Sequence, residues 1–295
     1  GIINYMSQKP TIILATSNGV GMGHLARASA VALALKDVAN PIIVSMAGGI
    51  AEVPAFMGIR CEYIPGRDRM WMSREKWDVY LRDRLLALAE ETGAKVLSFD
   101  GVVPYPGVIA AKNANPQLKL VWVRRGLWQK KPQRFILGLQ SKMMDKVIEP
   151  GDIARAYDFG PTANRKDSVV TSPVSLFRKE DAMSRDDARR ALGLDLNRPT
   201  ALVQLGTGDS DVNEKMTAAL AGLLGWKDLQ VILTKAPVDK DGNSLAPEGL
   251  DLKVVRYFPL AKVLHAFDAG ICATGYNGVH ELLPAQVPTV FVSNI

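Results

Sequence analysis

Short runs of aliphatic and β-branched residues alternate with helical patterns along most of the chain. The runs are 11–16, 41–45, 95–99 and 119–123, and a second series follows Pro199 at 201–205, 230–234, 253–257, 270–273 and 289–292. Each run is apolar almost throughout, which is typical of parallel strands buried on both faces. Strands that alternate with helices form parallel sheets covered by helices on both sides. The pattern therefore predicts an α/β fold.

Two helices are predicted in the first half, at 25–36 and 73–91, and the second places Trp77, Leu81, Leu85 and Leu88 on one face. The polar stretch 159–167 separates the two strand series and indicates a hinge. We therefore expect two doubly wound, Rossmann-like domains with a cleft between them, an N-terminal one at 1–160 and a C-terminal one at 168–295.

Composition excludes several classes of protein. Of the 295 residues, 47% are hydrophobic and 22% are charged, which indicates a globular chain. No apolar run reaches the roughly 18 residues of a membrane-spanning helix, and residues 1–10 do not resemble a signal peptide. Cys61 and Cys272 lie in apolar segments and are expected to be reduced core thiols of a cytoplasmic protein. The net charge of +6 comes with no nucleic-acid-binding module, so we expect no nucleic-acid partner.

In doubly wound domains, ligands bind beyond the carboxyl ends of the strands. The first predicted strand runs into a glycine loop that contains Gly21 and Gly23 and ends at His24, where a helix begins. A neutral histidine there would be able to take a proton from an acceptor hydroxyl, because a helix start disfavours its charged form. Alternatively, His24 caps the loop or contacts a phosphate.

Asp100 follows the predicted strand 95–99 and is expected to point into the same crevice. It would be able to hold His24 in the productive tautomer, as the acid does in a catalytic triad. Alternatively, it caps the helix predicted to begin near Tyr105.

The C-terminal segment carries the most specific motif of the chain. Ile271-Cys272-Ala273-Thr274-Gly275-Tyr276-Asn277-Gly278-Val279-His280-Glu281 is preceded by Arg256-Tyr257-Phe258-Pro259 and followed by Val287-Pro288-Thr289. This pattern resembles the donor-binding signature of UDP-glycosyltransferases and of the N-acetylglucosaminyltransferases that make lipid II. The loop 204–209 is similar to the family's glycine loop beside the donor diphosphate, and 21–24 is similar to its glycine–histidine loop.

The resemblance implies a metal-independent glycosyltransferase of the two-domain GT-B fold that uses a nucleotide diphosphate sugar and inverts the anomeric centre. The donor diphosphate would lie at the helix amides of 274–278 and beside Asn277, with Gly206, Thr207 and Gly208 nearby. Glu281, four residues after Asn277, would accept the ribose hydroxyls, while Tyr257 and Phe258 would form a uracil pocket with their backbone and rings. The implied donor-binding residues are Gly206, Thr207, Gly208, Tyr257, Phe258, Thr274, Gly275, Tyr276, Asn277, Gly278 and Glu281.

Two further features qualify this interpretation. The sequence stops at Ile295, before elements that the family carries after its last strand, so we expect the second domain to be incomplete. Asp209-Ser210-Asp211 has the form of a metal-binding D-x-D, but it follows a glycine loop and opens a helix, where Asp209 or Ser210 would serve as an N-cap. We therefore expect neither a metal nor a cofactor.

The acceptor is not identified by the sequence. The segment Arg124–Ile136 mixes cations with large apolar side chains, which suits contact with an anionic membrane and a lipid-linked acceptor. It equally suits a basic rim around an acceptor pocket or an ordinary helix start. Two other functions remain open: a sugar-nucleotide epimerase of the same fold, and a non-catalytic protein that binds nucleotide sugars.

Overall fold

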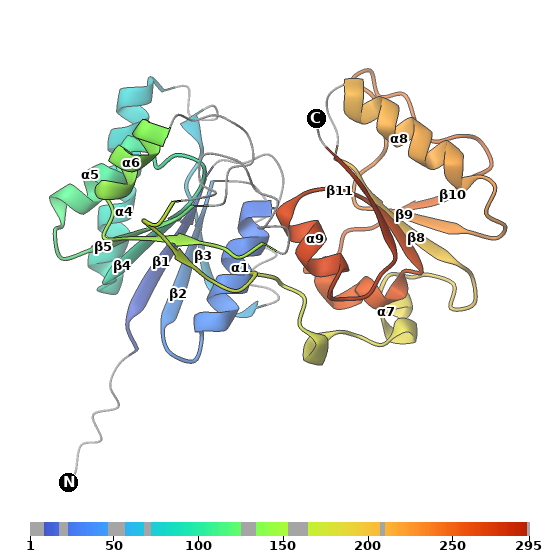
Figure 1. Ribbon diagram of the computed structural model, residues 1–295, viewed down its shortest axis with the longest axis horizontal. Coiled ribbons are helices and arrows are strands. Elements are labelled where there is room, and N and C mark those ends of the chain that lie inside the picture. The colour runs from blue at the N-terminus through green and yellow to red at the C-terminus, as the bar shows by residue number, and fades with distance from the viewer. Residues whose placement is uncertain are drawn as a thin grey trace, which may run out of the picture. The chain divides into compact units, whose positions relative to one another are not determined.

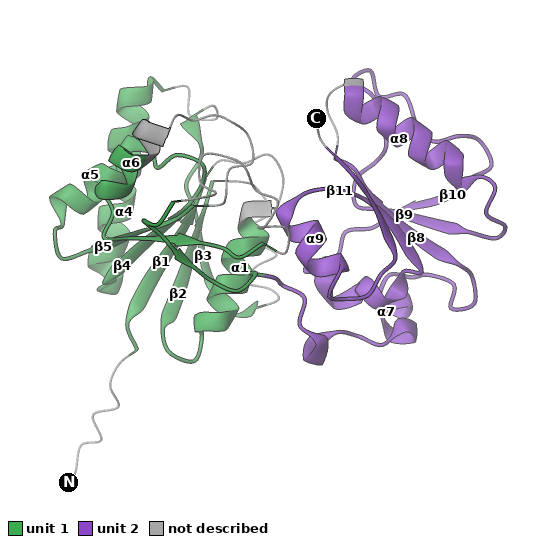
Figure 2. Ribbon diagram, viewed as in Figure 1, with its two compact units in different colours: residues 1–174 green, residues 175–295 purple. Residues whose placement is uncertain are grey.

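The computed structural model describes residues 9–17, 23–46, 57–67, 72–124, 134–152, 165–206 and 210–293. The chain divides into two compact units, residues 1–174 and 175–295 (Figure 2). The expected hinge at 159–167 lies before this boundary. Strand β7 (Val169–Val170) pairs with the first sheet through β6 (Lys146–Glu149). Residues 168–174, which we had assigned to the second domain, therefore belong to the first unit.

The described part of unit 1 contains a seven-stranded parallel sheet with the order β3-β2-β1-β4-β5-β6-β7 (Figure 1). Its other strands are β1 (Thr11–Thr16), β2 (Asn40–Ser45), β3 (Arg60–Tyr63), β4 (Val96–Asp100) and β5 (Lys119–Val123). The helices are α1 (Gly23–Leu35), α4 (Arg74–Thr92), α5 (Pro106–Ala114) and α6 (Arg134–Lys142).

Helix α4 shows how the local sequence sets its bounds. The Ser73 hydroxyl accepts a hydrogen bond from the Lys76 amide (3.3 Å), which caps the first turn. Gly93 ends the helix in the left-handed conformation, with φ 67°. The four residues predicted to share one face, Trp77, Leu81, Leu85 and Leu88, are all buried, so that prediction is confirmed.

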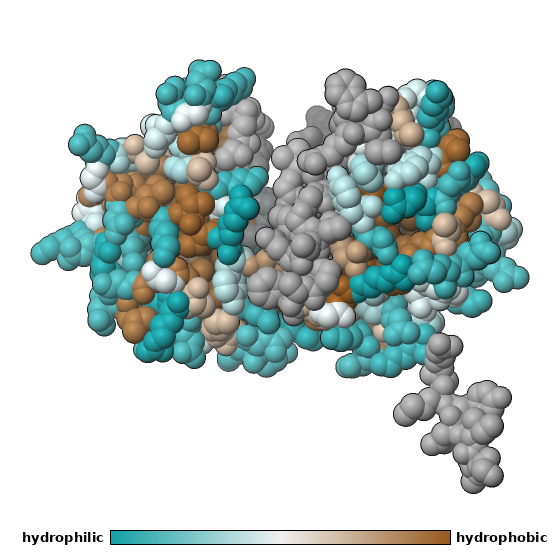
Figure 3. All heavy atoms as spheres, turned by 180° about the vertical axis from the view of Figure 1, so that it is seen from behind, coloured by the Kyte–Doolittle hydropathy of each residue, from teal (hydrophilic) through white to brown (hydrophobic). Residues whose placement is uncertain are grey.

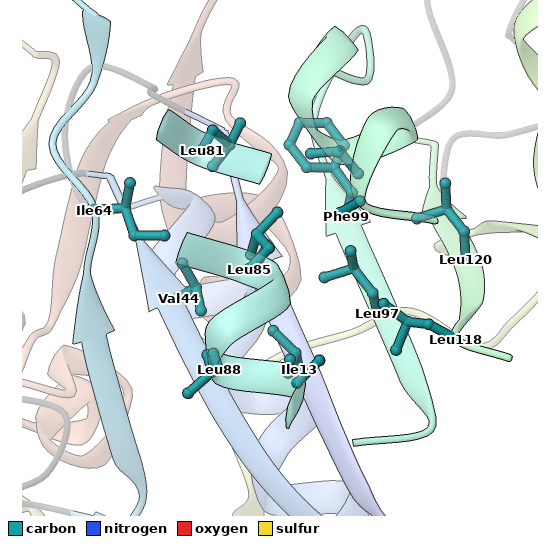
Figure 4. Close-up of a cluster of buried hydrophobic side chains, with 14 of the residues drawn as sticks. Ile13, Val44, Ile64, Leu81, Leu85, Leu88, Leu97, Phe99, Leu118 and Leu120 are labelled. Atoms are coloured by element: carbon teal, nitrogen blue, oxygen red, sulfur yellow. The ribbon is translucent and has the colours of Figure 1, made fainter. Parts of the chain in front are cut away.

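The core of unit 1 lies between the sheet and helices α4 and α5 (Figure 4). Leu81, Leu85 and Leu88 of α4 pack over Ile13, Val44 and Leu97, which come from three adjacent strands. Leu14 and Ile43 alternate with these residues, are also buried, and face the opposite side of the sheet, where α1 contacts β1 and β2. Both faces are therefore covered, as the continuously apolar strands predict.

Unit 2 contains a five-stranded parallel sheet with the order β10-β9-β8-β11-β12. Its strands are β8 (Thr200–Gln204), β9 (Gln230–Leu233), β10 (Asp251–Val254), β11 (Ala269–Ala273) and β12 (Thr289–Val292). Its helices are α7 (Arg185–Ala191), α8 (Ser210–Leu223) and α9 (Tyr276–Leu282), with 3₁₀ turns η2 (Lys179–Asp181) and η3 (Leu260–Ala266).

The two faces of this second sheet have separate cores. Helix α8 packs on one face, and α7, η3 and α9 cover the other (Figure 1). A buried arginine of α7 joins the layer formed by α7, η3 and α9 to the residues that lead into the sheet. Arg189 of α7 is fully buried and donates to the backbone oxygens of Ala266, Leu196 and Arg198 and to the Asp268 carboxylate (3.0 Å). Because every one of these partners is an oxygen, the buried charge is well compensated.

Each sheet reverses its strand order at one point. In unit 1 the chain leaves β1 toward β2 on one side and returns to β4 on the other. In unit 2 the same reversal separates β8 from β11. The carboxyl ends of the two strands at such a point diverge into different loops, which leaves a crevice where doubly wound proteins bind ligands. The predicted glycine loops follow β1 and β8. Asp100 ends β4, and the motif from Thr274 to Glu281 follows β11.

Within the described residues, no helix is long and apolar enough to cross a membrane. On the face shown in Figure 3, hydrophobic residues are interspersed with hydrophilic ones in both units. The exposed apolar side chains include Trp226 and Val290, which lie in unit 2 at the end of α8 and on the edge strand β12.

Candidate functional site

The predicted donor site is built around β8 and β11, which are hydrogen-bonded neighbours with Cys272 opposite Gln204. Gly206 follows β8 with φ 83°, a conformation that glycine adopts without strain. Thr274 and Gly275 follow β11 and are exposed. Because parallel strands end at the same edge, the two loops meet at the switch point of unit 2. Thr207 and Gly208 lie outside the described residues.

Backbone hydrogen bonds just before α9 involve two of the amides in the predicted anion site. The Thr274 amide donates to Val292 O (3.1 Å) and the Gly275 amide donates to Ala273 O (2.8 Å). These two amides therefore already donate to protein oxygens, and the expected diphosphate contact at the helix amides of 274–278 stays a prediction. The amides of 276–278 follow in the first turn of α9, where the helix dipole favours an anion.

Asn277 and Glu281 lie one turn apart on α9 and both are half-buried. Burial raises the pKa of Glu281 to about 7. Near neutral pH this carboxyl group therefore exchanges between its neutral and charged forms, so it can donate a hydrogen bond as well as accept one. A group of this kind is well suited to pair with hydroxyl groups.

Close packing of α9 against β11 depends on Gly278. A Cβ atom at this position would lie 2.9 Å from the Cys272 sulfur, so any larger residue would displace the helix or the thiol. Burial and then the nearby Glu281 charge raise the pKa of Cys272 to about 11, so the thiol stays protonated at neutral pH. This agrees with the expected core role of Cys272.

Three aromatic side chains of the predicted donor site, those of Tyr257, Phe258 and Tyr276, pack against other parts of unit 2. Tyr276 is buried and packs on His280, with ring centroids 4.1 Å apart. Phe258 is buried, and Tyr257 packs against the core cluster under α7, η3 and α9. The role of Tyr257 and Phe258 in a base pocket stays a prediction, with Phe258 buried and Tyr257 partly buried. Sequence spacing does not separate these roles, because an aromatic residue suits a core and a nucleobase equally.

In unit 1, Asp100 is the last residue of β4, beside Thr16 of β1. It is buried and forms a two-pronged ion pair with Arg27 of α1, in which Nε donates to Oδ2 and Nη2 to Oδ1. The alternative role as a helix cap is wrong, because Tyr105 occupies the N-cap position of α5. Of the predicted acceptor-side residues, Gly21 lies outside the described residues, Gly23 begins α1, and the side chain of His24 is not among those described.

Arg27 is the functional candidate that the sequence interpretation missed. It lies three residues after His24 on α1, so the ion pair fastens the first turns of this helix to the end of β4. The signal was a single arginine among the small apolar residues of 25–32, a position where an unpaired charge would be costly. Its partner could not be predicted from the sequence, because Asp100 lies 73 residues away in the chain.

Arg124, the first residue of the segment expected to contact a membrane, is not part of an exposed basic surface. Its side chain is buried, donates to Asp167 (2.9 Å) and Ser141 (2.9 Å), and lies over the Trp122 ring. Burial alone would raise the pKa of Asp167, but the hydrogen bonds from Arg124 and Arg165 outweigh this and hold it well below its usual range. Arg124 therefore anchors the segment before β7. Residues 125–133 lie outside the described part of the chain.

The D-x-D sequence lies at the start of α8. Asp209 is outside the described residues, and Asp211 forms an ion pair with Lys215 (3.0 Å) one turn along the helix. Among the described residues, no group of three or more histidine, cysteine or acidic side chains is placed to hold a metal ion.

No protein-family model matches the chain. Among curated proteins, it is 35% identical over 116 residues to the UDP-N-acetylglucosamine–N-acetylmuramyl-(pentapeptide) pyrophosphoryl-undecaprenol N-acetylglucosamine transferase of Paenarthrobacter aurescens, covering 38% of this chain and 31% of that protein. It is 33% identical over 143 residues to the Nocardioides protein of the same name, covering 46% and 39% respectively. The matched regions thus span about a third of the length of these relatives.

Solved structures share the fold over nearly the whole chain. The UDP-GlcNAc 2-epimerase of Neisseria meningitidis superposes with a TM-score of 0.66 at 12% identity, covering 97% of this chain and 83% of that one. The glycosyltransferase SnogD of Streptomyces nogalater gives 0.58 at 16% identity, covering 97% and 82%. The chain therefore has the GT-B fold of two parallel-sheet α/β units, and its sequence is similar to that of the UDP-N-acetylglucosamine-using glycosyltransferases.

Proposed function

We propose that the protein is a glycosyltransferase that moves a sugar from a UDP-sugar donor to an acceptor hydroxyl. The observation that carries this proposal is the motif from Thr274 to Glu281, which follows β11 at the switch point of unit 2. The sequence similarity to two transferases named for UDP-N-acetylglucosamine supports the same donor class. UDP-N-acetylglucosamine is therefore the first donor to test.

Unit 2 would hold the donor. The diphosphate would lie at the first amides of α9, from Tyr276 to Gly278, where the helix dipole favours negative charge. Asn277 would add a side-chain donor, and Glu281 one turn later would pair with the ribose hydroxyls. The exposed Gly275 supports a close ligand approach, since a Cβ atom there would meet no protein atom within 4 Å.

Unit 1 would bind the acceptor and supply the base. The acceptor oxygen attacks the anomeric carbon, the bond from that carbon to the diphosphate oxygen breaks, and UDP leaves with the bonding electrons. His24 takes the hydroxyl proton, and a single displacement of this kind inverts the anomeric centre. The Arg27–Asp100 pair would hold the start of α1, and with it His24, at the end of β4. Helix amides would stabilise the leaving diphosphate, so no metal ion is needed.

The two transferases are named for a pyrophosphoryl-undecaprenol acceptor, which favours a lipid-linked acceptor and peripheral membrane contact for this protein too. The described residues provide no support for Arg124 in that contact, since this side chain is buried.

The test is to incubate the protein with UDP-N-acetylglucosamine, with and without a pyrophosphoryl-lipid-linked acceptor, and to follow both nucleotide and sugar by NMR. A transferase releases UDP only when acceptor is present and gives a product of inverted configuration. Formation of a 2-epimer without acceptor would replace the proposal by the epimerase alternative. Binding with neither reaction would indicate a non-catalytic sugar-nucleotide-binding protein.

The base assignment has its own test. His24→Ala should lower the turnover number by about 10²–10⁴-fold, because a positioned general base contributes about that factor, and should leave UDP affinity unchanged. His24→Gln, which preserves size and hydrogen bonding but cannot take the proton, should lose as much. Loss of UDP affinity in either variant would instead make His24 a phosphate contact.

Metal independence is tested in the same assay. Turnover should be unaffected by excess EDTA, because amides rather than a cation would neutralise the leaving group. Loss of activity in EDTA that manganese restores would contradict this and would direct attention to Asp209 and Asp211.

A further inference from the structure

A cavity of about 440 Å³ lies within unit 1 between the start of α4 and the loop that leads into α5. Its lining includes Trp77, Val103, Pro104 and Tyr105, with Arg67 and Arg74 also part of it. This volume is within the range of about 300–1,000 Å³ that is usual for small-molecule sites. None of these residues belongs to the glycine loops or to the α9 motif.

The apolar wall of the cavity is fixed in place. Trp77 is buried, its indole N–H donates to Pro65 O (2.9 Å), and its ring packs edge-on against Tyr105 at a centroid distance of 5.0 Å. Tyr105 in turn packs edge-on against Phe99 at 5.3 Å. With the polar end of Trp77 already satisfied by the protein, this wall offers a ligand ring faces and aliphatic surface.

The described residues of the lining include two cationic side chains, Arg67 and Arg74, and one acidic side chain, Asp78. Arg67 and Arg74 have no hydrogen bond or ion pair with another side chain in the part of the chain that the structure describes. The acidic residue of the lining, Asp78, uses Oδ1 to accept the Gly107 amide (2.9 Å), which joins α4 to the start of α5. The described part of the lining thus holds two cations and one carboxylate beside an apolar wall, a net positive charge that favours an anionic ligand.

We propose that this cavity binds an amphipathic anion, with a phosphate or carboxylate at Arg67 and Arg74 and a ring or short aliphatic body against Trp77, Val103 and Tyr105. The ring contacts from Tyr105 to Phe99 lead to the end of β4, where Asp100 lies. This inference rests on the proposed function in one respect: the cavity would receive an acidic part of the acceptor.

The experiment is a calorimetric titration of the protein with 2-naphthyl phosphate, which needs neither donor nor turnover. We expect saturable binding at one site, with 2-naphthol and inorganic phosphate each binding at least about tenfold more weakly, because each lacks half of the recognised chemistry. The Arg67→Gln, Arg74→Gln double variant should lose about tenfold or more in affinity, since two charged contacts are removed.

Two further variants test the position of the site. Val103→Asp, at an exposed residue of the lining, should weaken the phosphate probe because it places a negative charge beside the proposed anion. Arg82→Gln is the matched control: it removes one charge from an exposed part of α4, where Arg82 pairs with Asp83 outside the cavity, and should leave affinity unchanged. Thermal melts of all variants would show that each remains folded.

Equal affinity of the double variant and the native protein would overturn the proposal, as would naphthol binding as tightly as the phosphate. Probe binding that is lost in Glu281→Ala but kept in the Arg67/Arg74 double variant would also overturn it, because the probe would then report the α9 motif in unit 2. A protein that binds the probe as expected but neither binds UDP nor transfers sugar would leave the cavity assignment intact and contradict the proposed function alone.

Discussion

At the scale of single residues, Glu281 is the group of the proposed donor site whose protonation the structure changes most. Burial raises its pKa in the folded protein to about 7, above the value of 4.5 for a free glutamate. The folded state therefore holds this proton more tightly than the unfolded state does. The stabilisation that results is fully present below about pH 4.5 and is lost as the pH rises through 7.

Glu281→Gln should remove this pH dependence, because glutamine stays neutral. Between pH 5 and pH 8 the native protein should lose about 1–3 kcal/mol more of its unfolding free energy than the variant does, because most of the interval between 4.5 and 7 lies in this range and each pKa unit represents about 1.4 kcal/mol. Urea unfolding of unit 2 at the two pH values measures the difference. Glu248→Gln, at an exposed loop residue, is the control and should follow the native protein. Parallel curves for native and Glu281→Gln would mean that Glu281 is charged at neutral pH.

At the scale of elements, the start of α9 is set by its contact with β11. Gly278→Ala places a methyl group 2.9 Å from the Cys272 sulfur and should cost about 1–3 kcal/mol of stability by overpacking. The same variant should weaken UDP binding, because it displaces the amides proposed to hold the diphosphate. Adding Cys272→Ala removes the sulfur and should restore part of both losses. Equal stability of Gly278→Ala and the native protein in thermal melts would show that the helix has room to move.

How much the sequence predicts also differs among elements. The strands at 11–16, 119–123 and 289–292 match their predicted bounds, because an apolar run between polar loops marks both ends. Strand β3 (Arg60–Tyr63) was not predicted, since its mixed polar sequence suits the edge of a sheet. Strand β7 has only two residues and exists through its pairing with β6, a contact that local sequence does not encode.

The candidate sites follow the same division. The sequence pointed to the loops after β8 and β11, because the apolar runs of both strands predict where they end and parallel strands end at one edge of a sheet. Residue roles that depend on packing between distant parts of the chain could not be predicted from the sequence. Three examples are the burial of Tyr276 at the start of α9, the Arg27–Asp100 ion pair and the burial of Arg124, which depend on how separate elements pack.

At the scale of the whole molecule, the protein consists of two units that each carry one switch point, with the proposed donor residues confined to unit 2 and the proposed base and cavity confined to unit 1. Ligands of one unit should therefore act locally. Saturating UDP should slow amide hydrogen exchange around the ends of β8 and β11 and at α9, and should leave the core strands of unit 1 unchanged. Protection that appears mainly around β1 and β4 would place the nucleotide in the other unit.

The central claim, that the α9 motif is a UDP-binding site, is tested most directly by calorimetric titration with UDP. The native protein should bind one UDP, and Glu281→Ala should bind it more weakly by about 1–3 kcal/mol, the cost of leaving the ribose hydrogen bonds unmade. Glu248→Ala, which removes the same charge from an exposed loop of unit 2, should bind UDP as the native protein does. Equal UDP affinity of the native protein and a folded Glu281→Ala variant would contradict the assignment.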